Sequence, residues 1–205
     1  MREVSLKEIY QIASNSREKI WEIAKSMYRE PKVYLHWSAG SYNAKFEDYH
    51  VSIDGDGKFF VSTEDFSQVL NGTYKRNSGA VNLSLCCAAG ATTNWLGTYP
   101  PTEKQIESMA ECIVAVCEGL WLTIDKGHVL THGEAAANED GLYLHPRYAC
   151  WADDFGDGNT RWDLEYLGTS ESPKYNPRAT NGSRGGDVLR GKALWYLPLL
   201  KETFK

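Results

Sequence analysis

The chain has few of the features that assign a protein to a class at first sight. Its 22 lysines and arginines are outnumbered by 27 aspartates and glutamates, which gives a formal net charge of -5. The basic surface expected of a nucleic-acid-binding protein is therefore missing, and we expect no nucleic acid partner. No apolar run approaches the roughly 20 residues that a transmembrane helix needs, so we expect no membrane partner either.

A secretory signal and a disulfide framework are also lacking. The first residues read MREVSLKEIYQIAS, and charges interrupt the apolar region that a signal peptide requires. The five cysteines are an odd number, and Cys86 and Cys87 are adjacent in an apolar run, which does not suit a set of disulfides. We therefore expect reduced core cysteines and synthesis in the cytoplasm without a signal peptide.

The composition is sufficient for one hydrophobic core, because 42% of the 205 residues are hydrophobic. Apolar periodicity and turn residues predict both helices and strands. The expected helices cover residues 5–27, 102–121 and 187–200, and the expected strands cover residues 33–36, 49–60 as a hairpin, and 80–88. The sequence therefore predicts a single α/β domain with a mixed central sheet flanked by helices.

Two details of the helices are specific enough to be checked. The Ser-Asn-Ser cluster at residues 14–16 predicts a break of the first helix, with Ser16 as the cap of its second part. Thr102 and Gln105 have the spacing of a capping box, and the apolar stripe that follows extends to Trp121.

Three potential metal ligands stand out along the chain. His132 and Asp163 lie near the two ends of the stretch formed by residues 128–164, and His36 ends an apolar run far upstream. Two imidazoles and one carboxylate suit catalytic zinc, which takes three such ligands and leaves a position for water. Their spacing matches no local metal motif, and a histidine at a strand end is often a hydrogen-bonded core residue.

Five segments, taken in order, carry a resemblance to a known family. They are VYLHWSAG, DYHVSIDGDGKFF, RNSGAVNLSLCCAAG, HGEAA and TRWDL, and they span roughly residues 32–168. In this order they resemble the zinc-dependent N-acetylmuramoyl-L-alanine amidases, the superfamily that includes phage lysozyme-like amidases and peptidoglycan recognition proteins. The resemblance implies a peptidoglycan recognition protein-like amidase fold, a Zn²⁺ cofactor and peptidoglycan as the substrate.

The resemblance also implies roles for individual residues. Zinc would be held by His36, His132 and Asp163. The hydroxyl of Tyr49 would face the metal, and Arg161 would stand where the family commonly has a lysine that stabilises the developing oxyanion. A packed aromatic and a solvated loop charge are the plain alternatives for Tyr49 and Arg161.

Several assignments stay open at this point. Glu134, two residues after His132, is a candidate proton-handling group or a capping carboxylate. Cys150 competes with Asp163 for the third ligand position, because some family members use cysteine there. The segment GTYKRN lacks the histidine that many members carry, and the aromatic-rich residues 138–160 are expected either to wall the cleft or to pack as a satellite cluster.

The reaction implied is hydrolysis of the amide between N-acetylmuramic acid and L-alanine of the stem peptide. A non-catalytic peptidoglycan-binding module and a zinc hydrolase of another amide are the alternatives. We expect an N-terminal helical segment over residues 1–30, the amidase domain over 31–168, and a docked loop and helix over 169–205. The protein would act on the cell wall after holin-mediated release, as a phage or prophage endolysin does.

Overall fold

The computed structural model describes residues 1–143 and 162–204. Within them, a six-stranded sheet has the order β1-β4-β3-β5-β2-β6. The strands are β1 Arg2–Val4, β2 Lys32–Trp37, β3 Val51–Ile53, β4 Phe59–Val61, β5 Ala80–Leu85 and β6 Val129–Thr131, and the helices are α1 Leu6–Ser26, α2 Glu103–Leu120, α3 His132–Ala136 and α4 Gly185–Phe204. The expected α/β class, with a mixed central sheet flanked by helices, is confirmed.

The centre of the sheet is parallel and one side is antiparallel. β2 pairs in parallel with β5 and β6, and β3 pairs in parallel with β5. β3 and β4 form the expected antiparallel hairpin, which continues to β1. Because the carboxyl ends of parallel strands meet at one edge, the residues that end β2 and β6 are brought together there.

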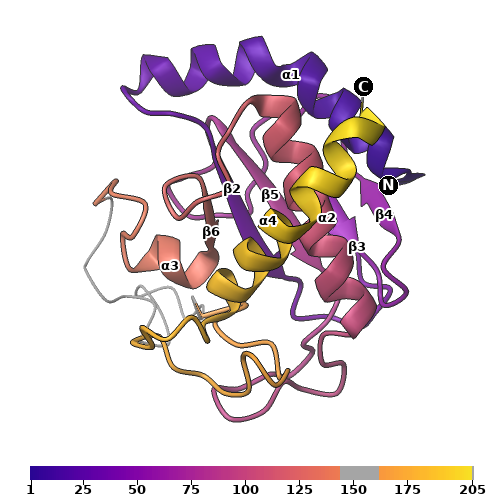
Figure 1. Cartoon of the computed structure of the whole chain (residues 1–205), viewed down its shortest axis with the longest axis vertical. Coiled ribbons are helices and arrows are strands. Elements are labelled where there is room, and N and C mark those ends of the chain that lie inside the picture. Colours follow the sequence, from indigo (N-terminus) through magenta and orange to yellow (C-terminus); the bar gives the residue numbers. More distant parts are fainter. Residues whose placement is uncertain (144–161, 205) are drawn as a thin grey trace.

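Alternation along β2 divides its side chains between two faces. Val33, Leu35 and Trp37 belong to the main hydrophobic core. Tyr34 and His36 point to the opposite face and are fully buried. In Figure 1, α2 and α4 lie across one face of the sheet, and α1 runs beside the end of α2. His36, together with Tyr34, therefore lies on the face that these helices do not cover.

The break expected in the first helix is wrong. α1 is continuous and begins at a capping box formed by Ser5 and Glu8. The hydroxyl of Ser16 donates to the carbonyl of Ile12 at 2.8 Å and accepts the backbone N–H of Phe66 at 2.8 Å. Ser16 thus provides a hydrogen-bond acceptor for the backbone of the loop that packs on the helix. This contact, which is distant in sequence, outweighs the local preference of serine for a helix cap.

The capping box predicted for α2 is confirmed, with Thr102 and Gln105 bonded reciprocally. The side-chain amide of Gln105 also donates to the carbonyls of Ile53 and Cys86 and so ties the helix to the sheet. Trp121 does not extend the buried stripe as expected. It has a φ of 59° as the C-cap residue and is 75% exposed, with the guanidinium of Arg17 3.7 Å from its ring centroid.

The terminal segments share the core of the sheet. A single cluster of buried side chains includes Ile9 from α1, Leu83 from β5 and Leu189 from α4. The ring of Phe204 stacks on that of Tyr10 at 4.8 Å. The domain boundaries expected from the sequence stay a prediction.

The cysteines that the structure describes are free and buried, as expected: Cys86, Cys87, Cys112 and Cys117. Burial raises the pKa of the Cys86 thiol to about 11 and those of the other three further. Among the described helices, none combines the length and the apolar character that crossing a bilayer requires.

A buried ion pair fixes the loop that precedes β5. Arg76 and Asp140 have fully buried side chains, and Arg76 Nη2 donates to Asp140 Oδ1 at 3.0 Å. The hydroxyl of Tyr34 donates to Asp140 Oδ2 at 2.9 Å, and Arg76 also reaches the side-chain oxygen of Asn138. The carboxylate therefore holds the loop of Arg76 against both β2 and the end of α3.

We expect Asp140→Ala to lower the free energy of unfolding by about 3–5 kcal/mol, because removing one partner leaves the guanidinium of Arg76 buried without its counter-charge. Urea denaturation measures the change. Lys104→Ala is the control, since Lys104 and Asp56 lie 3.7 Å apart with side chains that are 72% and 77% exposed, and exposed pairs contribute little. Equal losses in the two variants would contradict this account.

Candidate metal centre

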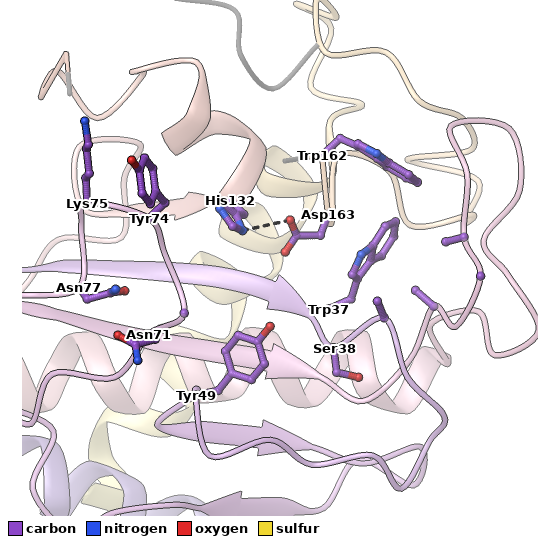
Figure 2. A pocket seen from close by; sticks show the side chains of 15 residues that line it. Trp37, Ser38, Tyr49, Asn71, Tyr74, Lys75, Asn77, His132, Trp162 and Asp163 are labelled. Atoms are coloured by element: carbon purple, nitrogen blue, oxygen red, sulfur yellow. Dashed lines mark ion pairs between the residues drawn. The ribbon is translucent and has the colours of Figure 1, made fainter. Parts of the chain in front are cut away.

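Three side chains from distant parts of the chain converge at the edge of the sheet. One ligand atom each from His36, His132 and Asp163 lies within 4.8 Å of the others. His36 Nδ1 is 3.1 Å from Asp163 Oδ2, and His132 Nδ1 is 3.3 Å from Asp163 Oδ1. Figure 2 shows the His132–Asp163 pair at the centre of the pocket. The structure thus brings together the three ligands expected from the sequence.

The parallel sheet positions the two histidines. Leu35 of β2 is paired with Thr131, the last residue of β6, and these two residues are followed directly by His36 and His132. Thr131 is also the N-cap of α3, and its hydroxyl accepts the backbone N–H of Glu134. Consequently the chain turns from strand to helix at His132, and the imidazole is presented at the sheet edge.

The residues on either side of Asp163 hold it in place. Leu164 is fully buried and has a φ of 62°, a conformation that non-glycine residues seldom adopt. Trp162 is 6% exposed, and its ring lies 5.1 Å from that of Trp37 in an edge-to-face arrangement. Buried apolar neighbours on both sides therefore restrict the position of the carboxylate.

Two imidazoles and one carboxylate are a donor set of the kind that zinc binds. Each imidazole nitrogen lies close to a different oxygen of Asp163, and one donor atom from each of the three residues lies within 4.8 Å of the others. Burial by itself raises the pKa of Asp163, but the charges and hydrogen bonds of His132 and His36 outweigh burial and hold that pKa well below its usual range. Asp163 is thus a carboxylate anion, the form that binds a metal.

The far side of the His36 ring is held by two polar side chains. His36 Nε2 lies 3.1 Å from Asn82 Oδ1 and 3.0 Å from Thr73 Oγ1, and Thr73 donates to the same Asn82 oxygen at 2.7 Å. A proton on Nε2, donated to Asn82 Oδ1, would leave the lone pair of Nδ1 available to bind a metal beside Asp163. Sequence reasoning missed both residues, although Asn82 stands out as a polar residue within an apolar strand.

Tyr49 lies beside the three ligands. Its ring centroid is 5.1 Å from that of His36, and in Figure 2 its hydroxyl points toward Asp163. Burial, followed by the charge of Asp163, raises the pKa of the phenol. Tyr49 is therefore a neutral hydrogen-bond donor near neutral pH.

The three ligands stand over a cavity of about 710 Å³, to which His132 and Asp163 contribute lining atoms. Trp37 and Trp162 form one side of it, as Figure 2 shows. The opposite side carries amide, phenol and ammonium groups from the loop before β5: Asn71, Tyr74, Lys75 and Asn77. This loop includes the segment without the family's histidine, and it lines the cavity with other polar groups.

Glu134 does not join the three ligands. Its carboxylate is fully buried and accepts from Arg190 Nη1 at 2.7 Å and from Arg190 Nη2 at 2.8 Å. It also accepts the N–H of Thr131 in a capping box. Burial opposes ionisation, but Arg190 outweighs it and lowers the pKa of Glu134. Of the two roles considered for it, the geometry matches the capping carboxylate.

The other expectations for this region fall outside the described residues. Arg161 and Cys150 belong to residues 144–161, as does most of the aromatic segment 138–160. Their assignments rest on the sequence.

Comparisons with known proteins give structural similarities only. A scan against protein-family models finds no match, and a comparison with curated protein sequences finds none. Drosophila PGRP-LB is 17% identical, with 51% of this chain and 70% of that chain covered at a TM-score of 0.38. Drosophila peptidoglycan recognition protein SD is 15% identical, with coverages of 62% and 85% at 0.39.

The third similar structure is the Ph2119 endolysin from Thermus scotoductus MAT2119 bacteriophage Ph2119. It is 12% identical, with 69% of this chain and 91% of that chain covered at a TM-score of 0.40. These titles name two of the groups that the sequence pattern resembles. Because all three TM-scores are below 0.5, we base the functional proposal on the site and on the sequence pattern.

We expect Asp163→Ala to lose bound zinc and Cys150→Ser to retain it, because Asp163 completes the cluster with His36 and His132. Elemental analysis of the two purified variants measures the zinc content, and circular dichroism confirms that both are folded. If only the cysteine variant loses zinc, Cys150 and not Asp163 is the third ligand.

Proposed function

We propose that the protein is a zinc-dependent N-acetylmuramoyl-L-alanine amidase, which hydrolyses the bond between the lactyl group of N-acetylmuramic acid and L-alanine. The observation that carries the proposal is the convergence of His36, His132 and Asp163 beside an open cavity, with Tyr49 directed at the same point. A structural zinc site is closed by four protein ligands, whereas three ligands at a cavity leave a position for water.

Zinc bound by these three residues would lower the pKa of its water toward 7 and polarise the scissile carbonyl. The residues of the chain supply the orientation. Asn82 and Thr73 fix the ring of His36 through Nε2. Tyr49 donates a hydrogen bond toward the oxygen on which negative charge develops. A neutral phenol suits this role, because its hydrogen bond becomes stronger as the charge on that oxygen grows.

Arg161 is proposed as a second stabiliser of that charge, on the strength of its place two residues before Asp163. A guanidinium stays protonated at all relevant pH values and offers a planar set of donors. It would therefore keep the charge of the family's lysine while presenting it in a different shape.

Features of the cavity support a glycopeptide substrate. Its volume lies within the roughly 300–1,000 Å³ of ligand pockets. The half-exposed ring of Tyr74 offers apolar surface of the kind that packs on sugar rings, and Asn71 and Asn77 offer amides that can pair with peptide groups.

The two alternatives are a binding module without catalysis and a zinc hydrolase of another amide. A complete donor set with a tyrosine donor beside it is unnecessary for binding alone, and it favours the enzyme. For the cellular setting we propose synthesis in the cytoplasm and access to the cell wall after release by a holin.

Digestion of purified peptidoglycan tests the reaction. We expect the protein to release intact stem peptides whose new amino termini are L-alanine, and we expect dialysis against a chelator to abolish the release and added zinc to restore it. Mass spectrometry of the soluble products identifies the bond that is cut. Sedimentation with peptidoglycan in the absence of products would instead support the binding module, and products with other ends would point to another bond.

Tyr49→Phe removes the hydroxyl and keeps the ring that lies against His36. We expect kcat to fall by about 10²-fold or more while the zinc content and KM change little, because the lost hydrogen bond is stronger in the transition state than in the ground state. Steady-state kinetics on a soluble muramyl peptide measure both constants. Tyr42→Phe, at a tyrosine whose hydroxyl donates to the carbonyl of Pro100, is the matched control, and equal rates in the two variants would remove Tyr49 from the mechanism.

A further inference from the structure

The start of α4 touches both segments that carry the ligands His132 and Asp163. We propose that Arg184, Gly185, Gly186 and Arg190 are positioning residues, which set the separation of these two ligands and thereby the metal affinity of the site. This inference rests on the proposed metal centre. It gives the C-terminal helix a part in that centre, although none of its residues is among the three ligands.

Gly185 meets the backbone of the segment that carries Asp163. A Cβ atom at Gly185 would lie 1.9 Å from the carbonyl oxygen of Leu164, far inside van der Waals contact. The N–H of Gly185 donates to the carbonyl of Glu165 at 3.1 Å. Because Leu164 follows Asp163 directly and has a left-handed conformation, any displacement of its peptide group moves the carboxylate.

Gly186 and Gly133 allow a similarly close approach between the segment that carries His132 and its neighbours. A Cβ atom at Gly186 would lie 2.6 Å from Glu134 Oε2, and one at Gly133 would lie 2.5 Å from Glu165 Oε1. Glu134 belongs to the helix that begins at His132. The three segments therefore meet at glycines, where side chains would hold them apart.

Two buried arginines connect α4 to the same two segments. Arg184 Nε donates to Glu165 Oε2 at 3.0 Å, and Arg184 Nη2 lies 3.1 Å from Glu165 Oε1. Arg190 forms the corresponding fork with Glu134. Each carboxylate is two residues from a candidate ligand, so Arg190 of α4 is paired beside one of them and Arg184, the residue before α4, beside the other.

A hydrogen bond connects the segment that carries His132 directly to the segment that carries Asp163. The hydroxyl of Thr131, the residue before His132, donates to Glu165 Oε1 at 2.9 Å. The two ligands are thus linked to each other through Thr131 and Glu165 and are both linked to α4. Within residues 1–143 and 162–204, no hydrogen bond or ion pair from α4 reaches His36, which lies in β2.

The choice of charged groups at this contact is informative. Apolar residues of α4, Leu189 and Ala193, already anchor the helix in the core, and buried ion pairs add little stability over apolar packing because desolvation is costly. Forked arginine–carboxylate pairs do fix direction and distance. Metal ligands need such support, since a site must be held to about 0.5 Å for tight binding.

Gly185→Ala and Gly191→Ala test the inference as a pair. Both glycines lie in α4, neither has a positive φ, and a Cβ at Gly191 meets nothing within 4 Å. We expect Gly185→Ala to weaken zinc binding at least tenfold in a chelator competition and to change the visible absorption of the Co²⁺-substituted protein, which reports the ligand geometry. We expect Gly191→Ala to match the wild type in both measurements.

Arg184→Lys is the second variant, because it keeps the charge beside Glu165 and removes the fork. We expect it to fold and to show a smaller change of the Co²⁺ spectrum in the same direction as Gly185→Ala. If Gly185→Ala does not fold, the result for Arg184→Lys decides the matter.

The outcomes separate this inference from the proposed function. A wild-type protein that binds no zinc would overturn the metal centre and, with it, the role of α4. Zinc binding by the wild type, with unchanged affinity and Co²⁺ spectrum in a folded Gly185→Ala or in Arg184→Lys, would overturn the role of α4 alone.

Discussion

The parallel pairing of β2 with β6 is the interaction on which the rest of the site depends. It places the ends of two strands, which are almost a hundred residues apart in the chain, at one edge of the sheet. His36 and His132 follow directly from this register, since each comes immediately after the paired residues Leu35 and Thr131. The third ligand has no strand to carry it, and Asp163 needs support from elsewhere.

That support comes from buried polar groups as well as from the apolar neighbours Trp162 and Leu164. Glu134 and Glu165 are almost fully buried; Glu134 is paired with Arg190 of α4, and Glu165 with Arg184, the residue before α4. Burial raises the pKa of Glu165, although the charge of Arg184 opposes this change. In such surroundings an unpaired charge is costly, so the carboxylates and arginines hold one another in place.

Buried pairs of side chains also hold the walls of the cavity beside the candidate ligands. Arg76 and Asp140, both with buried side chains, hold the loop whose neighbouring residues Tyr74 and Lys75 line one side. On the other side the edge-to-face packing of Trp37 and Trp162 joins the end of β2 to the residue before Asp163. Residues that line the cavity are thus adjacent in sequence to residues that stabilise the fold.

The sequence by itself determined the α/β class, the hairpin and the capping box of α2, because burial and capping produce local patterns in the sequence. It also predicted three candidate metal ligands, His36, His132 and Asp163, which the structure brings into one cluster. Only the tertiary structure decided that Ser16 serves a loop within a continuous helix, that Asn82 and Thr73 orient His36, and that Glu134 faces Arg190. The physical reason is that the role of a buried polar side chain depends on the group with which it forms hydrogen bonds or an ion pair. Arg190 lies 56 residues from Glu134, and no local pattern in the sequence records such a pairing.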